Sequence, residues 1–206
     1  MEVKIITTGP FWTNTYLITN NNKSILIDPS LELSNKLDLN TLNIEAILLT
    51  HGHIDHIEGI KYLNKPIYIF NLEADFLKDN KLNLALLFNI NYQYKEPQEV
   101  IKLYDNQEFS LIGLKIKVIH TPGHTRGSVT YQIENNLFTG DTLFQCSKGR
   151  TDFYTGDEDM LDKSLIKLID SFKSDTTIYP GHGERSTIGF EKEYNPFYKQ
   201  AKLNQM

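Results

Sequence analysis

The sequence predicts a mixed α/β fold in which two β-sheets pack together and helices cover their outer faces. Short runs rich in Val, Ile, Leu, Thr and Tyr recur along most of the chain, as in β-strands, and segments with helical spacing lie between them. The chain has 206 residues and contains no Gly/Ser-rich, Pro-rich or like-charged linker. We therefore expect a single domain over residues 1–206, built from packed layers around a core.

The first third of the chain is rich in strand signals. The three asparagines at 20–22 separate two short β-type runs and are typical of a hairpin turn. Ala46–Thr50 is continuously apolar, as in a strand that is buried on both faces. The expected elements are strands over Val3–Thr7, Thr15–Thr19, Ser24–Asp28, Ala46–Thr50 and Pro66–Phe70, and a helix over His56–Leu63.

The rest of the chain begins with a segment that is harder to interpret and then returns to strands. Leu72–Leu87 fits two short helices broken near Asn80, and Asp157–Ser171 places five apolar residues at helical spacing. The tail from Gly189 is also expected to be helical. The remaining expected strands are Val100–Tyr104, Glu108–Leu111, Leu114–His120, Ser128–Ile133, Leu137–Thr139 and Thr176–Tyr179.

Composition excludes several classes of function. The net charge of −5 argues against a broad basic surface for nucleic acid or anionic lipid. Residues 1–6 lack the basic and apolar regions of a signal peptide, and no apolar run approaches the roughly 20 residues of a membrane span. Cys146 is the only cysteine, which suits a reducing compartment. We expect a cytoplasmic monomer or small homo-oligomer.

The histidines indicate where the chemistry lies. All six fall in glycine-flanked segments that follow predicted strands, which is where scaffolds present functional groups. The densest segment runs from Thr50 to His56. In an extended stretch His51 and His53 point to the same side and can converge on one ion, while Asp55 and His56 would turn toward a second position if they open a helix. Imidazole and carboxylate ligands suit Zn²⁺, or Fe and Mn in oxygen-rich sites.

Three further segments carry single candidates. Pro122-Gly123 predicts a tight turn between His120 and His124, and either histidine could complete a three-imidazole site. Asp141 follows a glycine at the end of an apolar strand, where a carboxylate is costly unless it is paired, bound to metal or used as a helix cap. His182 lies between two glycines that allow close backbone approach, although a buried structural histidine would also fit.

In order and in strand context, these segments resemble the metallo-β-lactamase-fold hydrolases. The matching motifs cover nearly the whole chain: His51-x-His53-x-Asp55-His56, Pro-Gly-His124-Thr, Gly-Asp141 and Gly-His182-Gly. Within that superfamily the chain is most similar to the short bacterial form of glyoxalase II (hydroxyacylglutathione hydrolase). That similarity extends to Asn14-x-Tyr16, Ile27-Asp28-Pro29, Gly149–Phe153, Ser186–Gly189 and Asn195–Phe197, with Ser30 where the family often has glycine.

The resemblance implies a four-layer αβ/βα sandwich that holds two divalent metal ions, Zn²⁺ before Fe or Mn, at one edge. Carried over by position, one ion is held by His51, His53 and His124, the second by Asp55, His56 and His182, and Asp141 bridges them. Asp28 and His120 would then be outer groups that orient ligating imidazoles.

The resemblance also implies a reaction. Asp55 and Asp141 are the expected catalytic residues, with water activated by the two ions as the nucleophile. The expected substrate is a small thioester such as S-D-lactoylglutathione, because a thiolate leaves without a general acid. Arg150 and Tyr154 lie where glyoxalases contact the peptide-like part of the substrate, although a surface arginine and a packed tyrosine fit the sequence equally well. Cys146 is expected to be a small buried side chain without a role.

Other functions remain open at this point. A persulfide dioxygenase with one iron resembles the same segments, including Gly149–Phe153, and so does a lactone or ester hydrolase of the same fold. A flavodiiron oxygen reductase would place Glu at position 53 and add a flavin domain, and a nuclease would add segments that grip RNA. A non-catalytic metal-binding module would not need a bridged pair of sites.

Overall fold

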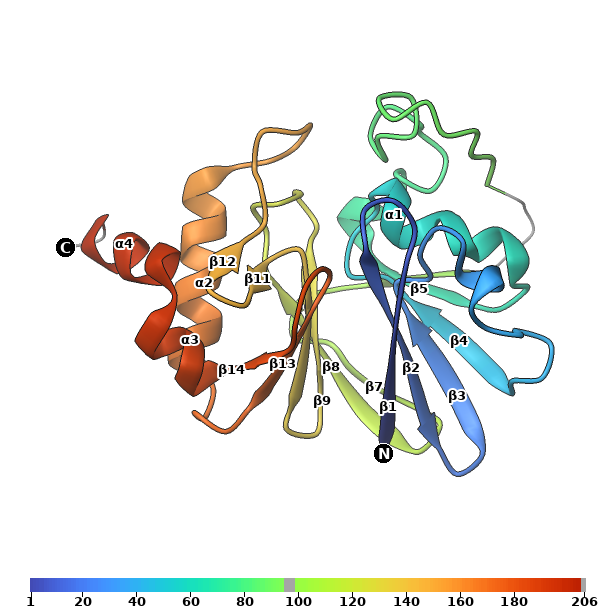
Figure 1. The fold of residues 1–206 in the computed structure, drawn as a ribbon, viewed down its shortest axis with the longest axis horizontal. Helices are drawn as coiled ribbons and strands as arrows, with labels where there is room; N and C mark the ends of the chain where they lie inside the picture. Colours follow the sequence, from blue (N-terminus) through green and yellow to red (C-terminus); the bar gives the residue numbers. More distant parts are fainter. Residues whose placement is uncertain (95–98, 205–206) are drawn as a thin grey trace.

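The computed structural model, which describes residues 1–94 and 99–204, is a four-layer sandwich of two sheets between two layers of helices (Figure 1). The first sheet has six strands in the order in which they occur in the chain. Its first three strands are antiparallel and its last three continue in parallel. They are β1 (Glu2–Thr8), β2 (Thr13–Asn20), β3 (Lys23–Ile27), β4 (Ile44–Leu48), β5 (Ile67–Phe70) and β6 (Val100–Leu103).

The second sheet has the order β14-β13-β10-β9-β8-β7. Its strands β10 and β13 are parallel, so the chain segments that follow them start at the same edge. The strands are β7 (Glu108–Leu111), β8 (Leu114–His120), β9 (Val129–Ile133), β10 (Asn136–Gly140), β13 (Thr177–Pro180) and β14 (Ser186–Thr187). A separate small hairpin consists of β11 (Leu143–Phe144) and β12 (Ser147–Lys148).

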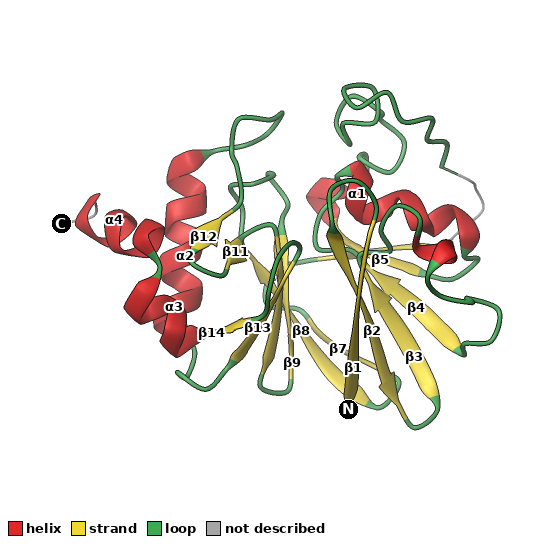
Figure 2. Cartoon of the chain, viewed as in Figure 1, coloured by secondary structure: helices red, strands yellow, loops and turns green. Residues whose placement is uncertain are grey.

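Alternation along the strands divides the core into layers. In β2, Tyr16 and Ile18 face the second sheet and pack with Tyr131 and Phe138, while Leu17 packs on the opposite face. This outer face is covered by α1 (Ile54–Ile57) and by the 3-10 helices η1 (Leu33–Asn35) and η2 (Glu58–Tyr62). A third 3-10 helix, η3 (Asn71–Glu73), follows β5. Figure 2 shows these helices and those of the second sheet on the two outer sides of the strands.

Helices α2 (Glu158–Ser171), α3 (Ile188–Tyr194) and α4 (Pro196–Asn204) cover the second sheet. Asp157 caps α2 by accepting a bond of 2.9 Å from the Met160 N–H, and four apolar residues of α2 are buried. The helix predicted over Asp157–Ser171 and the helical tail are therefore confirmed. The predicted strands are confirmed as well, with ends that shift by a few residues. In the described part of the chain, no helix is long and apolar enough to cross a bilayer.

Two helix predictions need correction. Leu72–Leu87 begins within η3 and continues as turns instead of two short helices. Asp79 accepts bonds from the backbone N–H groups of residues 81 and 82, and Asn83 accepts one from Ala85, so side chains replace regular helical bonds. The helix predicted over His56–Leu63 begins earlier, at Ile54, and becomes a 3-10 helix at Glu58, where the Gly59 N–H bonds to the Pro29 carbonyl.

Candidate metal centre

The first cluster of possible ligands contains His51, His53 and His124. One ligand atom from each lies within 4.8 Å of the others, and all three residues are buried. His51 and His53 follow β4, whereas His124 comes from the loop after β8 in the other sheet. The Nδ1 atom of His53 lies 2.9 Å from Nε2 of His124. Of the two histidines that the sequence left open, His124 therefore joins the pair.

The second cluster contains Asp55, His56 and His182, whose ligand atoms also lie within 4.8 Å of one another. Asp55 and His56 stand in the first turn of α1, and His182 follows β13. Oδ2 of Asp55 lies 3.4 Å from Nε2 of each histidine. Asp55 and His56 do stand at the start of a helix, but His56 stays close to the first cluster, with its ring centroid 4.2 Å from that of His51.

Asp141 lies between the two clusters. Its Oδ2 is 3.6 Å from Nε2 of His124 and 3.3 Å from Nε2 of His182, and its Oδ1 is 3.3 Å from Nε2 of His56. The carboxylate thus faces one histidine of the first cluster and both histidines of the second. The parallel pairing of β10 and β13 explains part of this arrangement, because Asp141 and His182 both come directly after these neighbouring strands.

Outer partners hold the second ring nitrogen of several of these histidines. Asp28 Oδ2 is 3.0 Å from Nδ1 of His56, and the same carboxylate accepts bonds from the N–H and hydroxyl of Thr50. The carbonyl oxygens of Arg150 and Phe11 lie 2.7 Å and 3.0 Å from Nδ1 of His124 and His182. Such bonds fix the tautomer, so that Nε2 of each ring faces the centre.

The outer role predicted for Asp28 fits this geometry, but that of His120 does not. The His120 ring stacks on Phe70 with centroids 4.5 Å apart, and its Nε2 lies 3.0 Å from the Arg126 carbonyl. It bonds to the loop that carries His124 and not to a ligand candidate. The chain bends at residues 123–125, between His120 at the end of β8 and the loop that carries the His124 ring to the first cluster.

The polar atoms that lack hydrogen bonds indicate that these residues can bind metal ions. Nε2 of His51 is buried and makes no hydrogen bond, and the buried Nε2 of His56 and Oδ1 of Asp141 face each other at 3.3 Å without forming one. Such buried polar atoms are costly in a folded protein unless a ligand satisfies them. Imidazole nitrogens and carboxylate oxygens are ligands for Zn²⁺, Fe and Mn. The two clusters are therefore suited to bind two metal ions.

The family follows from a match that covers most of the chain. A family model of the metallo-β-lactamase superfamily matches residues 8–182, the range that contains every ligand candidate. The chain belongs to the metallo-β-lactamase superfamily. Its four-layer sandwich is the metallo-β-lactamase fold, as the sequence predicts. Members of this superfamily are generally metal-dependent hydrolases.

Individual members of the superfamily agree with this assignment. The hydroxyacylglutathione hydrolase GloC of Haemophilus influenzae is 34% identical, with 96% of this chain and 98% of that protein covered. The structure of the B3 metallo-β-lactamase BLEG-1 superimposes with a TM-score of 0.88 at 35% identity, covering 96% and 99% of the two chains. A protein solved in a di-iron-bound form, TTHA1623, gives a TM-score of 0.81 at 32% identity and coverage of 95% and 100%.

The two clusters differ in charge in this superfamily member. Burial lowers the pKa values of His51, His53 and His124, which favours neutral imidazoles. Burial also lowers the pKa values of His56 and His182 in the second cluster, but the nearby carboxylates raise them by more. The charges of Asp55 and Asp141 raise the pKa of His56 well above its usual value, and Asp141 raises the pKa of His182 to about 10.

Metal binding to the metal-free protein is therefore expected to release about two protons per chain at pH 7. His56 and His182 are charged at this pH and must become neutral to bind metal, whereas the other three histidines are already neutral. Asp55 and Asp141 release none, because the charged histidines hold the pKa values of both carboxyls well below the usual range. Calorimetric titration in buffers of different ionisation enthalpy measures the number. Release near zero would contradict this charge distribution.

Glu73, which no sequence motif singled out, supports the first cluster. Its carboxylate is fully buried and accepts bonds of 2.9 Å from the N–H groups of Gly52 and Gly127. Burial raises the pKa of Glu73 to about 7, despite these bonds. Gly52 separates His51 from His53, and Gly127 belongs to the loop of His124, so one side chain links the two loops. The sequence did contain a signal for this role: Glu73 follows the strand β5, which is parallel to β4 and ends at the same edge of the sheet.

Arg150 and Tyr154 lie at the surface near the first cluster. The Arg150 guanidinium makes two bonds of 2.6 Å to Asp152 and lies 4.0 Å from the centroid of Phe153. Tyr154 is exposed and has Lys81 over its ring. The prediction of a buried Cys146 is wrong: the residue is exposed in the turn between β11 and β12, where its φ of 53° directs the chain around the hairpin.

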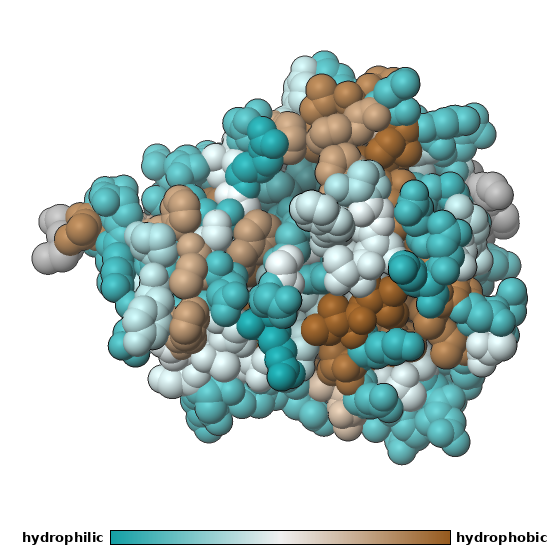
Figure 3. Space-filling view, in the orientation of Figure 1, coloured by the Kyte–Doolittle hydropathy of each residue, from teal (hydrophilic) through white to brown (hydrophobic). Residues whose placement is uncertain are grey.

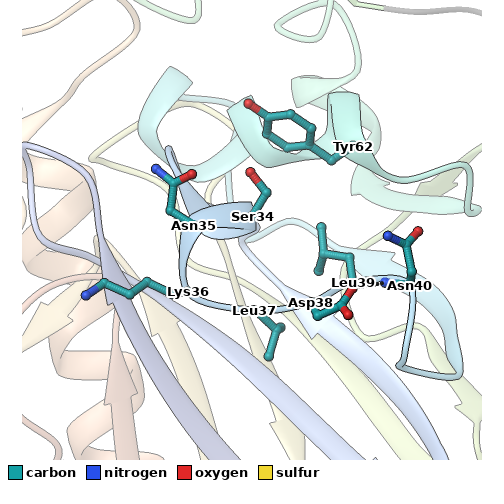
Figure 4. A pocket seen from close by; sticks show the side chains of 8 residues that line it. All are labelled: Ser34, Asn35, Lys36, Leu37, Asp38, Leu39, Asn40 and Tyr62. Atoms are coloured by element: carbon teal, nitrogen blue, oxygen red, sulfur yellow. Dashed lines mark hydrogen bonds between the residues drawn. The ribbon is translucent and has the colours of Figure 1, made fainter.

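A surface pocket of about 510 Å³ lies away from these residues (Figure 4). It is formed by η1, the loop after it and η2. Its lining contains no histidine and no cluster of possible ligands, so it offers no comparable chemistry. The lining residues are Ser34, Asn35, Lys36, Leu37, Asp38, Leu39, Asn40 and Tyr62.

Proposed function

We propose that this superfamily member is a thioester hydrolase with two divalent metal ions, and that it cleaves substrates such as S-D-lactoylglutathione to a 2-hydroxy acid and a free thiol. The position of Asp141 between the two clusters carries the proposal, since one carboxylate facing both is suited to hold two ions side by side. The likeness to hydroxyacylglutathione hydrolase GloC supports the choice of thioester.

In this proposal His51, His53 and His124 hold one ion, Asp55, His56 and His182 hold the second, and Asp141 contacts both. Zn²⁺ is the ion we propose, and Fe or Mn would suit the same donors. When bound, such a pair of ions supplies Lewis-acid polarisation of the carbonyl and activates water. Residues 1–206 are proposed to act as one catalytic domain on a small molecule in the cytoplasm, as a monomer or small homo-oligomer.

The chain itself contributes orientation. Asp28 and the carbonyl groups of Arg150 and Phe11 hold imidazoles with Nε2 toward the centre, and the Thr13 hydroxyl donates a bond of 2.8 Å to Oδ2 of Asp55. The sole cysteine is at an exposed hairpin turn, so we assign no covalent role to it. A thioester matches this centre because the thiolate product needs no proton from the protein to leave.

The test combines metal analysis with a substrate panel. Protein purified without chelator should contain about two metal ions per chain and cleave S-D-lactoylglutathione, and chelator should abolish the cleavage. The panel includes a homoserine lactone and, because of the likeness to BLEG-1, a β-lactam. Opening of either ring without thioester cleavage would refute the named activity. One iron per fully loaded chain together with oxygen uptake would favour the dioxygenase.

Arg150→Ala is expected to raise KM for S-D-lactoylglutathione several-fold with a smaller change in kcat. The side chain is 58% exposed, so its guanidinium can exchange Asp152 for a carboxylate of the thiol part. Loss of such a contact weakens the ground state and transition state equally. Steady-state kinetics measures both constants, with Arg185→Ala as the control. A fall in kcat at constant KM would contradict a binding role.

A further inference from the structure

Three phenylalanine rings from separate loops meet beside the candidate metal centre. Phe11 lies in the turn between β1 and β2, Phe88 in the segment between β5 and β6, and Phe153 after β12. The ring centroids of Phe11 and Phe88 are 4.8 Å apart, and those of Phe88 and Phe153 are 6.1 Å apart, both in edge-on contact. Rings this close form one continuous apolar surface.

The ring of Phe153 lies beside the first cluster of ligand candidates, and the backbone of Phe11 contacts the second. The centroid of Phe153 is 5.9 Å from that of His53 in the first cluster. At the other end, the Phe11 carbonyl lies 3.0 Å from Nδ1 of His182 in the second cluster. A molecule that lies along the three rings therefore has one end beside the proposed reacting position.

Phe88 itself and apolar residues next to the rings in the chain are exposed to solvent. Trp12 is 75% exposed, Leu86 69%, Leu87 62% and Phe88 37%. Trp12 also has a φ of 53°, a left-handed conformation that is unfavourable for a bulky residue. Figure 3 shows apolar surface at the top of the molecule, over the segment between β5 and β6. Groups of exposed apolar side chains mark binding surfaces more often than single exposed apolar residues do.

We propose that this apolar rim binds the apolar acyl group of the thioester substrate. The rim is Phe11, Trp12, Leu86, Leu87, Phe88 and Phe153. The inference rests on the proposed thioester hydrolysis and adds a substrate class: thioesters with alkyl or aryl acyl chains react faster than those with small hydroxyacyl groups. Arg150 lies over the face of Phe153 at 4.0 Å, where the polar thiol part would reach its guanidinium.

The first experiment measures binding without turnover. Trp12 is the only tryptophan, so its fluorescence reports on the rim. In the metal-loaded protein, S-hexylglutathione should shift the emission to shorter wavelength at concentrations where S-methylglutathione does not. Phe88→Ala should weaken the affinity for the hexyl compound roughly fivefold. The control is Phe190→Ala, because Phe190 on α3 is 39% exposed, much as Phe88 is.

The second experiment measures selectivity with acetyl, lactoyl, hexanoyl and phenylacetyl thioesters of glutathione. The ratio of kcat/KM for hexanoyl over acetyl should be roughly tenfold or more, since each partly covered methylene adds to binding. Phe88→Ala and the double variant Leu86→Ser/Leu87→Ser should reduce this ratio several-fold. Phe190→Ala should leave it unchanged, and thermal unfolding shows whether each variant is folded.

The outcomes separate the two proposals. Thioester cleavage with equal kcat/KM for all acyl groups would overturn the apolar rim and leave the hydrolase intact. Binding of S-hexylglutathione that depends on Phe88, with no thioester cleaved, would support the rim and refute the hydrolase. A change of mass of the Leu86/Leu87 variant in sedimentation, with unchanged selectivity, would mean that the rim controls self-association. That result would also overturn the inference.

Discussion

Asp141→Asn is expected to lower thioester turnover by about two orders of magnitude or more while leaving the fold intact. The carboxylate faces Nε2 of His124, His56 and His182 at 3.3–3.6 Å, so its loss removes negative charge from between both clusters. Asparagine has nearly the same shape and keeps one oxygen. The metal content should fall below two per chain, and residual activity should need higher pH, because loss of one metal ion leaves less positive charge to lower the pKa of the water.

The measurements are kcat at several pH values, metal content after dialysis, and thermal unfolding. Asp159→Asn is the control, since it removes the same charge from an exposed position in the first turn of α2. A near-normal rate at neutral pH together with two metal ions would refute the proposed contact of Asp141 with both ions. A collapse of thermal stability without metal would show that the residue mainly supports the fold.

Glu73→Gln is expected to weaken both the fold and the first cluster. The amide of glutamine offers one acceptor oxygen, so the N–H of Gly52 or Gly127 loses its partner inside the protein. An unpaired buried N–H costs about 1–3 kcal/mol of unfolding free energy. The loops of His51, His53 and His124 are then less fixed relative to each other, and affinity for metal in this cluster should fall about 10- to 100-fold.

Two readouts distinguish positioning from simple stability. Urea unfolding of the metal-free protein gives the change in unfolding free energy, and titration with Co²⁺, followed by its visible absorption, gives affinity and ligand geometry. Glu45→Gln is the matched control, because Glu45 is the exposed residue of β4. An unchanged Co²⁺ affinity and spectrum, alongside reduced stability, would mean that Glu73 supports the core without positioning the histidines.

The sequence predicted most of the secondary structure because most elements have a strong local pattern. The apolar run at 46–50 and the capped, amphipathic segment at 157–171 each specify an element without reference to the rest of the chain. Local patterns failed where side chains compete with the backbone, as Asp79 and Asn83 do in the segment predicted as two helices. The two-residue strands β11, β12 and β14 are too short to give a periodic signal.

The sequence by itself determined the family and the candidate ligands, because spacings such as His51-x-His53-x-Asp55-His56 are local and are set by a strand end followed by a helix. The spacing alone left His120 and His124 open, and the resemblance implied His124 and a bridging Asp141. The tertiary structure placed His124 in the first cluster and Asp141 between the clusters, and it alone showed that Glu73 links two loops. It also brought together Phe11, Phe88 and Phe153, which are far apart in the chain. These contacts depend on how the two sheets pack, and long-range packing leaves no periodic trace in the sequence.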